Sequence, residues 1–161
     1  MAGLGLLALR LTLASILVAH GAHTLFGAWA GPGIGPGGIA AEAAAYAALG
    51  LQPATTIVTV SGVLQLLGGA LLTIGFLTRW ASLLLLADVG LGVWKIQWPW
   101  GFFLNYTDAA GRGHGLEYGL LMAGALVCLV LAGAGEWSVD GVRNRSAATR
   151  AAGRARLRGK V

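Results

Sequence analysis

The sequence contains little cysteine and little charge, and both shortages restrict its chemistry. Cys128 is the only cysteine among 161 residues, which excludes an intrachain disulfide and a dithiol redox centre. Because Cys128 lies in the apolar run ALVCLVLAG, we expect a small packing residue. The chain also lacks a nucleotide-binding glycine loop and a convincing pair of haem-ligating histidines. These absences favour a non-enzymatic scaffold that anchors or assembles a larger complex.

The shortage of charge accompanies an excess of apolar residues. Only 11% of the residues are charged and 57% are hydrophobic, and the mean hydropathy is +0.74, which is too apolar for a soluble domain of this length. Four apolar stretches each approach the ~20 residues that cross ~30 Å of hydrocarbon: 4–27, 54–77, 80–97 and 115–134. Because backbone groups in lipid must pair within their own segment, the sequence predicts an all-α fold, a four-transmembrane-helix bundle.

The first apolar stretch resembles a secretory signal because it is N-terminal and is followed by small residues. Arg10 stands inside its apolar core, however, and no charge precedes it, so we interpret the stretch as an uncleaved first helix. The long side chain of Arg10 is expected to snorkel to the cytoplasmic headgroups.

The two longer connections carry recognisable signals. Turn formers in WAGPGIGPGG precede residues 39–49, which read as a short outer-surface helix between the first and second spans. The other connection gathers aromatic residues at headgroup level, namely Trp98, Trp100, Phe102, Phe103 and Tyr106. An aromatic belt explains them; alternatively, they close the mouth of a pocket for a flat, lipophilic ligand.

Basic residues set the predicted orientation and a boundary at Asp140. Seven of the eleven Lys and Arg residues follow it, with no acidic residue among them. We therefore predict a membrane domain over residues 1–140 and a basic cytoplasmic tail over 141–161, with both termini cytoplasmic. The tail is expected to attract anionic lipid rather than nucleic acid. It is either a disordered segment that fixes topology or a helix on the lipid surface.

Polar residues inside the spans are expected to concentrate in the outer half of the bilayer. At ~1.5 Å per residue, Gln65 and Asp88 fall near the midplane, and His20 lies ~7 Å outward. His23, Lys95 and Glu117 lie ~10 Å outward, where Lys95 and Glu117 can pair across the third and fourth helices. A midplane carboxylate costs ~3 kcal/mol on insertion scales, so Asp88 should face the interior, protonated or paired with another helix.

His20 and His23 are one helical turn apart and can face the same neighbour. Three roles compete for them: metal or haem ligation, interhelical hydrogen bonding, and anchoring or proton exchange for a ligand. His114 is the only other histidine, so we predict no metal site. We predict instead that His20, Gln65 and Asp88 border a pocket for a quinone headgroup, with Trp94 or the outer aromatics beside the ring. The alternative is a polar network that only ties helices together.

Several motifs resemble those of the bacterial DoxX family of small integral membrane proteins. HGAHTLFG, LGLQPA, GVLQLLGGALLTIGFLTR and GAGEWSVD occur in matching order, between Arg10 and Asp140. The resemblance implies a four-helix membrane bundle in the bacterial cytoplasmic membrane, often a small subunit associated with quinone-linked oxidoreductases. Family members usually carry lysine at the position of Thr24 and glutamate at that of Gln65, so this chain has lost an opposite-charge couple.

The predicted function is a small membrane subunit of a quinone-linked oxidoreductase, with a quinone as the cofactor that this role would use. Its partners would be the lipid bilayer and another protein of the complex, or further copies of itself. Asp88 and His20 are the candidate proton-handling residues. The full set of candidate ligand-binding residues is His20, His23, Thr24, Gln65, Asp88, Trp94, Lys95 and Glu117. The alternatives are a non-enzymatic anchor or assembly scaffold and a carrier of a lipophilic molecule.

Overall fold

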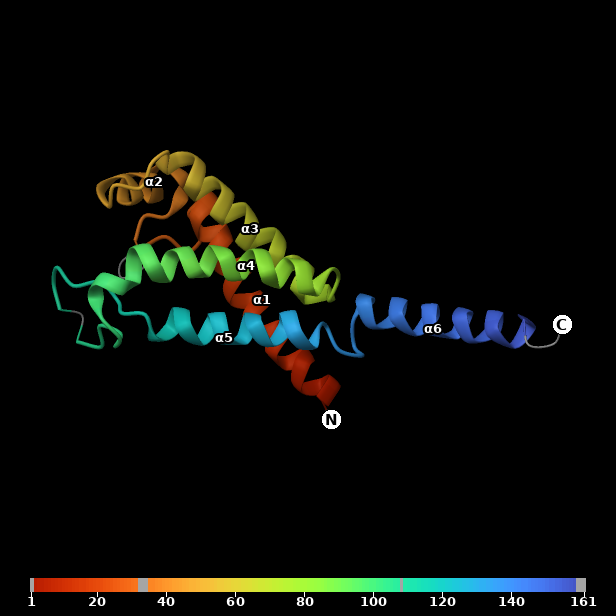
Figure 1. The fold of residues 1–161 in the computed structure, drawn as a ribbon. Coiled ribbons are helices and arrows are strands. Elements are labelled where there is room, and N and C mark those ends of the chain that lie inside the picture. Colours follow the sequence, from red (N-terminus) through yellow and green to blue (C-terminus); the bar gives the residue numbers. More distant parts are fainter. Residues whose placement is uncertain (1, 32–34, 108, 159–161) are drawn as a thin grey trace.

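The computed structural model describes residues 2–31, 35–107 and 109–158, and over these residues it is helical (Figure 1). One isolated bridge joins Gly31 and Gly35. The α-helices are Ala2–Phe26 (α1), Gly38–Ala48 (α2), Ala54–Ile74 (α3), Thr78–Gly92 (α4), Glu117–Ala132 (α5) and Val139–Arg158 (α6). The predicted all-α class is therefore confirmed, and the helices fall on the four apolar stretches, the short connecting helix and the basic tail.

Two helices meet the length and composition required to cross a membrane, Gly3–Phe26 within α1 and Ala54–Ile74, which is α3. The helix α5 is apolar but has 16 residues, and α4 has 15, which corresponds to about 22 Å of the ~30 Å hydrocarbon thickness. Four membrane spans stay a prediction.

The third apolar stretch changes its hydrogen-bond pattern along its length. After α4 ends at Gly92, the segment Val93–Gln97 is a π-helix and Trp98–Trp100 is a 3₁₀ turn. The chain thus stays helical to Trp100, although not as the single regular helix that the sequence predicts. Wide π-turns occur frequently at functional sites.

The helices pack as two crossing pairs. α1 packs most extensively against α3, and α4 packs against α5, and in Figure 1 the first pair crosses the second obliquely. Leucines fill the centre: Leu17, Leu72, Leu85, Leu126 and Leu129 are buried. At one end, α2 covers α3 through contacts that include Ala43 and Val58.

Glycines allow α1 and α3 to approach closely. A Cβ atom on Gly21 would lie 2.5 Å from the Leu66 nitrogen and 2.8 Å from the Gly62 oxygen. A Cβ atom on Gly69 would lie 2.8 Å from a methyl group of Val18. The glycines of α3 therefore serve helix packing, as small residues do in membrane bundles.

Arg10 does not snorkel to the headgroups, and that expectation is wrong. Its side chain is 1% exposed, and its Nη1 and Nη2 donate hydrogen bonds to the carbonyl oxygens of Ala134 (2.6 Å) and Trp137 (2.7 Å). These carbonyls belong to the connection between α5 and α6, where they have no helical partner to accept from. The guanidinium group turns inward because two unpaired carbonyls lie within its reach.

Asp140 joins the tail to the membrane helices. Its carboxylate accepts hydrogen bonds from the backbone nitrogens of Leu77 (3.1 Å) and Thr78 (2.9 Å). These are among the unpaired N–H groups at the start of α4, so Asp140 caps a helix that precedes it by some sixty residues. The motif GAGEWSVD therefore connects the start of α6 to the start of α4 through Asp140.

The basic tail is helical in its described part. The helix α6 begins at Val139, before the predicted boundary at residue 140, and continues to Arg158. A disordered tail is therefore the wrong alternative for this part of the chain. In Figure 1, α6 projects away from the bundle end at which α1 begins.

Candidate functional site

A cavity of about 340 Å³ lies between α1, α3, α4 and α5, and Tyr46 of α2 also lines it. Much of the wall is apolar, with Leu17, Ile57, Val89 and Met122 among its residues. Polar side chains reach it from several elements: His20, Tyr46, Ser61, Gln65, Asp88, Lys95, Gln97 and Tyr118. A mostly apolar cavity with a few convergent polar groups is the usual form of a small-molecule site.

Gln65 and Asp88 form a hydrogen-bonded pair at this cavity. Gln65 Nε2 donates to Asp88 Oδ2 at 2.7 Å and to Ser61 Oγ at 3.0 Å. Ser61 and Gln65 are one turn apart on α3, and the pair reaches across to α4, so Asp88 has the partner from another helix that its burial requires. Both hydrogens of the Gln65 amide nitrogen are thereby used, which leaves Gln65 Oε1 for a further partner.

Gln97 brings a second amide to the cavity from the π-helical segment. Its Oε1 atom is buried and has no hydrogen-bond partner among the described residues. The amide packs on Gly119 of α5, where a Cβ atom would collide with Gln97 Oε1. A buried acceptor without a donor is costly, so this oxygen is suited to accept a hydrogen bond from a ligand.

His20 lies between the cavity and a second pocket of about 450 Å³ that is also lined by His23, Trp29 and Glu42. His23 Nδ1 lies 2.8 Å from the Ala28 carbonyl oxygen. Because a carbonyl only accepts, Nδ1 carries the proton. His23 Nε2 lies 3.7 Å from Glu42 Oε1 of α2, so ionisable groups of α1 and α2 meet in the wall of this second pocket.

Tyr46 of α2 faces the same cavity as Asp88. Burial raises the pKa of the Tyr46 hydroxyl above its ordinary value, and the negative charges of Asp88 and Glu42 raise it further. The phenol therefore keeps its proton at neutral pH and can donate a hydrogen bond into the cavity.

The DoxX family model matches residues 5–98, which is more than half of the 161-residue chain. The chain belongs to the DoxX family. The matched residues include all of the polar cavity residues described above except Tyr118, which lies in α5.

A curated relative extends the comparison. This DoxX chain is 32% identical over 96 residues to the uncharacterized membrane protein Rv3486 of Mycobacterium tuberculosis, and the match covers 57% of this chain. The chain spans 58% of the length of that relative. No solved structure matches the chain. The protein is therefore a membrane protein of the DoxX family with apolar helices.

The structure brings together half of the predicted ligand-binding residues of this DoxX chain. His20, Gln65, Asp88 and Lys95 line the cavity, and their role as ligand-binding residues stays a prediction. The remaining four lie elsewhere: His23 lines the second pocket, Thr24 packs its methyl group near Gly62, Trp94 is 61% exposed, and Glu117 contacts Tyr106.

The predicted Lys95–Glu117 ion pair is wrong for the structure. Lys95 Nζ lies 3.9 Å above the ring of Trp94, and Tyr106 donates a hydrogen bond to Glu117 Oε1. Within the described residues no ion pair joins the two charges. This hydrogen bond is the main cause of a raised pKa of Tyr106. The segment between α4 and α5 thus supplies a partner for each charge, Trp94 for Lys95 and Tyr106 for Glu117, which depth in the membrane does not predict.

Sequence reasoning missed Tyr46, Gln97 and Tyr118 in the cavity wall and Glu42 beside His23. The helix of residues 39–49 was predicted to lie on the outer surface, but its polar residues Glu42 and Tyr46 are spaced i, i+4 and so share a face. That spacing is the signal that could have located them. In the part of the chain that the structure describes, no group of three His, Cys, Asp or Glu residues could hold a metal.

Proposed function

We propose that this DoxX protein is a membrane subunit of a quinone-linked oxidoreductase and that its cavity binds a quinone headgroup. The observation that carries the proposal is the Gln65–Asp88 pair in a largely apolar cavity that His20 also lines. A carboxylate inside a membrane bundle is costly and marks a functional site by default. The electron donor would be a partner subunit, because the chain has one cysteine and no cluster-binding set.

The residues present fit a flat ring with oxygen atoms at two edges. His20 and Tyr46 can donate hydrogen bonds to carbonyl oxygens of a quinone, whereas Gln65 Oε1 and Gln97 Oε1 can accept them from hydroxyl groups of a quinol. The buried, unpartnered Gln97 Oε1 supports a ligand that offers a hydroxyl hydrogen. Gly119 leaves room beside this amide, where a larger residue would displace it.

A bound quinone would supply two-electron chemistry coupled to two protons. Within the chain, Asp88 Oδ2 is occupied by Gln65, so Oδ1 is the atom that would hold or release a proton. His20 would pass protons between the cavity and the second pocket, where His23 and Glu42 lie 3.7 Å apart. The apolar walls would exclude water from the headgroup.

We place this cavity in a four-span bundle. The continuation of α4 through Val93–Gln97 and Trp98–Trp100 lengthens a helix that is otherwise short for a span, and α5 can cross where tilt and local thinning of the bilayer accommodate it. The basic tail favours cytoplasmic termini, which would put the second pocket and α2 on the outer side.

Substitution of the polar pair tests the proposal. The Asp88→Asn and His20→Gln variants retain size and hydrogen bonding, so we expect them to fold, to alter the quinone content measured by mass spectrometry after native purification, and to lower quinone turnover by the native complex by about 100-fold or more. Thr59→Val is the control, because Thr59 Oγ1 donates its hydrogen bond to the Thr55 carbonyl of its own helix.

A steric pair tests the cavity without changing any polar group. Gly119→Ala forces the Gln97 amide to move and should lower quinone content, whereas Gly124→Ala, in the same helix with no atom within 4 Å, should not. If folded Asp88→Asn and His20→Gln preparations keep their quinone content and activity, the polar groups only tie helices together. The chain would then be a membrane anchor or assembly scaffold.

A further inference from the structure

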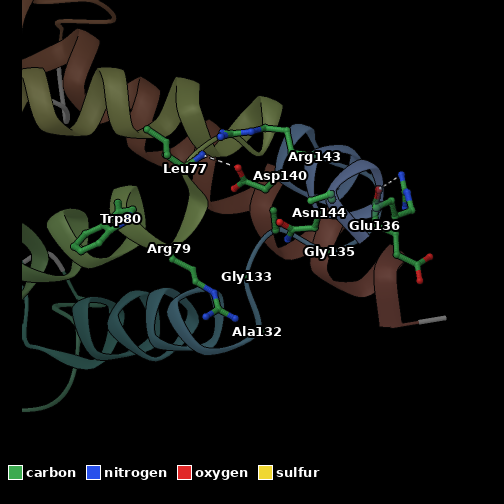
Figure 2. A pocket seen from close by; sticks show the side chains of 14 residues that line it. Leu77, Arg79, Trp80, Ala132, Gly133, Gly135, Glu136, Asp140, Arg143 and Asn144 are labelled. Atoms are coloured by element: carbon green, nitrogen blue, oxygen red, sulfur yellow. Dashed lines mark hydrogen bonds between the residues drawn. The ribbon is translucent and has the colours of Figure 1, made fainter. Parts of the chain in front are cut away.

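A third hollow lies at the opposite end of the bundle, where α4 begins, α5 ends and α6 starts. This cleft measures about 900 Å³ and is unrelated to the proposed quinone cavity. Figure 2 shows side chains from three segments around it. The charged residues in its wall are Arg79, Arg143, Arg145, Glu136 and Asp140.

The arginines are positioned with donors left over. Arg79 Nη2 donates to the Leu131 carbonyl at 3.1 Å, and Arg145 Nη2 donates to the Glu136 carbonyl at 3.2 Å. Arg143 lies 5.6 Å from the centre of the Phe76 ring and has no hydrogen-bond partner among the described residues. Each guanidinium has five N–H donors, so most of them remain for an anion.

The acidic residues of the cleft do not neutralise these arginines. Both oxygens of Asp140 accept hydrogen bonds from the start of α4, and the buried guanidinium of Arg10 lies near enough to interact with its charge. In Figure 2 the Glu136 carboxylate is directed away from Arg79 and Arg143. Within the described residues no salt bridge joins Glu136 or Asp140 to an arginine, so the cleft keeps an excess of positive charge.

An apolar surface adjoins the cleft along α4. Trp80 lines the cleft and is 67% exposed, and Leu84 follows it one turn later and is also exposed. Residues spaced i, i+4 share a face of a helix, so an apolar strip runs from the arginines toward the middle of the bundle. A tryptophan at such a boundary is typical of the headgroup level of a membrane.

We propose that this cleft binds an anionic glycerophospholipid. The phosphate would be bound by the arginines of the cleft wall, and an acyl chain would follow Trp80 and Leu84. Charge complementarity argues for the phosphate, and the continuous apolar strip argues for a lipid over a free anion. Basic pockets between membrane helices bind headgroups in this manner. The site would connect α6 to the bilayer surface at a defined point instead of through diffuse attraction to the tail.

Native mass spectrometry of the full-length protein with added lipid tests the site. We expect phosphatidylglycerol to bind more tightly than phosphatidylcholine of the same chains, and the Arg79→Gln/Arg143→Gln variant to lose about 30-fold in affinity for phosphatidylglycerol. The Arg112→Gln/Arg150→Gln variant removes the same charge outside the cleft and should bind as the unmodified protein does. Inorganic phosphate at millimolar concentration should not displace the lipid.

Two results would overturn the proposal. Equal loss of affinity in both double variants would show diffuse attraction, and displacement of the lipid by inorganic phosphate would show a free-anion site. Arg143→Gln alone guards against misfolding, because this side chain makes no hydrogen bond with the described residues, and it should still weaken phosphatidylglycerol binding. Trp80→Ser should lower the affinity for phosphatidylglycerol and leave any binding of inorganic phosphate unchanged.

Discussion

Arg10 and Asp88 are charged residues within the helices, and each obtains the hydrogen bonds that its charge requires from a different kind of partner. Arg10 gives hydrogens to two backbone carbonyls of the α5–α6 connection, whereas Asp88 accepts one from the Gln65 side chain. Backbone carbonyl oxygens do not titrate and only accept the hydrogen bonds, so we interpret Arg10 as a structural residue. The Gln65–Asp88 pair lines a cavity, so a ligand can reach its remaining oxygen atoms.

The first prediction concerns Arg10. Replacement by methionine keeps much of the apolar length but leaves the carbonyls of Ala134 and Trp137 without donors. Hydrogen bonds to charged groups contribute ~1.5–3 kcal/mol each, so the loss of two in Arg10→Met should lower the free energy of unfolding by about 3 kcal/mol or more. Thermal unfolding in detergent measures this.

Arg10→Lys separates charge from geometry. One ammonium group cannot match the planar fork that reaches two carbonyls, so the lysine variant should recover only part of the stability. Arg150→Gln is the control, because Arg150 is exposed on α6. If Arg10→Met were as stable as this control, the two hydrogen bonds would not hold the connection in place.

At the scale of elements, α1 and α3 depend on a contact that only glycine allows. Gly21 is buried against the backbone of Leu66 and Gly62. Gly21→Ala should therefore separate the helices and lower the free energy of unfolding by ~1–3 kcal/mol. Gly5→Ala, in the same helix with no atom within 4 Å, should be neutral or stabilising by up to ~1 kcal/mol, because alanine is the better helix former. Chemical unfolding of both variants provides the comparison, and equal stability would reject the close contact.

Hydrophobic runs predicted where the helices lie, because length and apolarity are local properties of the chain. They could not predict the partners of Arg10, because these depend on the path of the α5–α6 connection. Nor could they predict that Lys95 lies over the ring of its neighbour Trp94 instead of reaching another helix. Depth along the helix brought His20, Gln65 and Asp88 to one level, and the structure turns all three toward one cavity. The same criterion placed Glu117 beside Lys95. In the structure Glu117 instead accepts a hydrogen bond from Tyr106 of the α4–α5 connection, a contact that depth alone does not determine.

The whole molecule has two chemically different ends. Arg79, Arg143 and Arg145 surround the cleft at the end from which α6 projects (Figure 1), whereas the ionisable residues His20, His23 and Glu42 gather near α2 at the other. Positive charge close to membrane helices favours the cytoplasmic side. A quinone site near α2 and a lipid site near α6 would then lie in opposite halves of the bilayer.

The last prediction is that both termini are cytoplasmic. In a Cys128→Ala background, a cysteine introduced at Ala109, in the connection between α4 and α5, should react with a membrane-impermeant maleimide in intact cells, and one at Ser146 of α6 should react only after lysis. Ala44 of α2 samples the other outer connection better than Gly35, whose φ of 98° disfavours a cysteine. Labelling of Ser146→Cys without Ala109→Cys in intact cells would reverse the orientation. Labelling of both would mean an even number of spans between them, so that α5 would not cross the membrane.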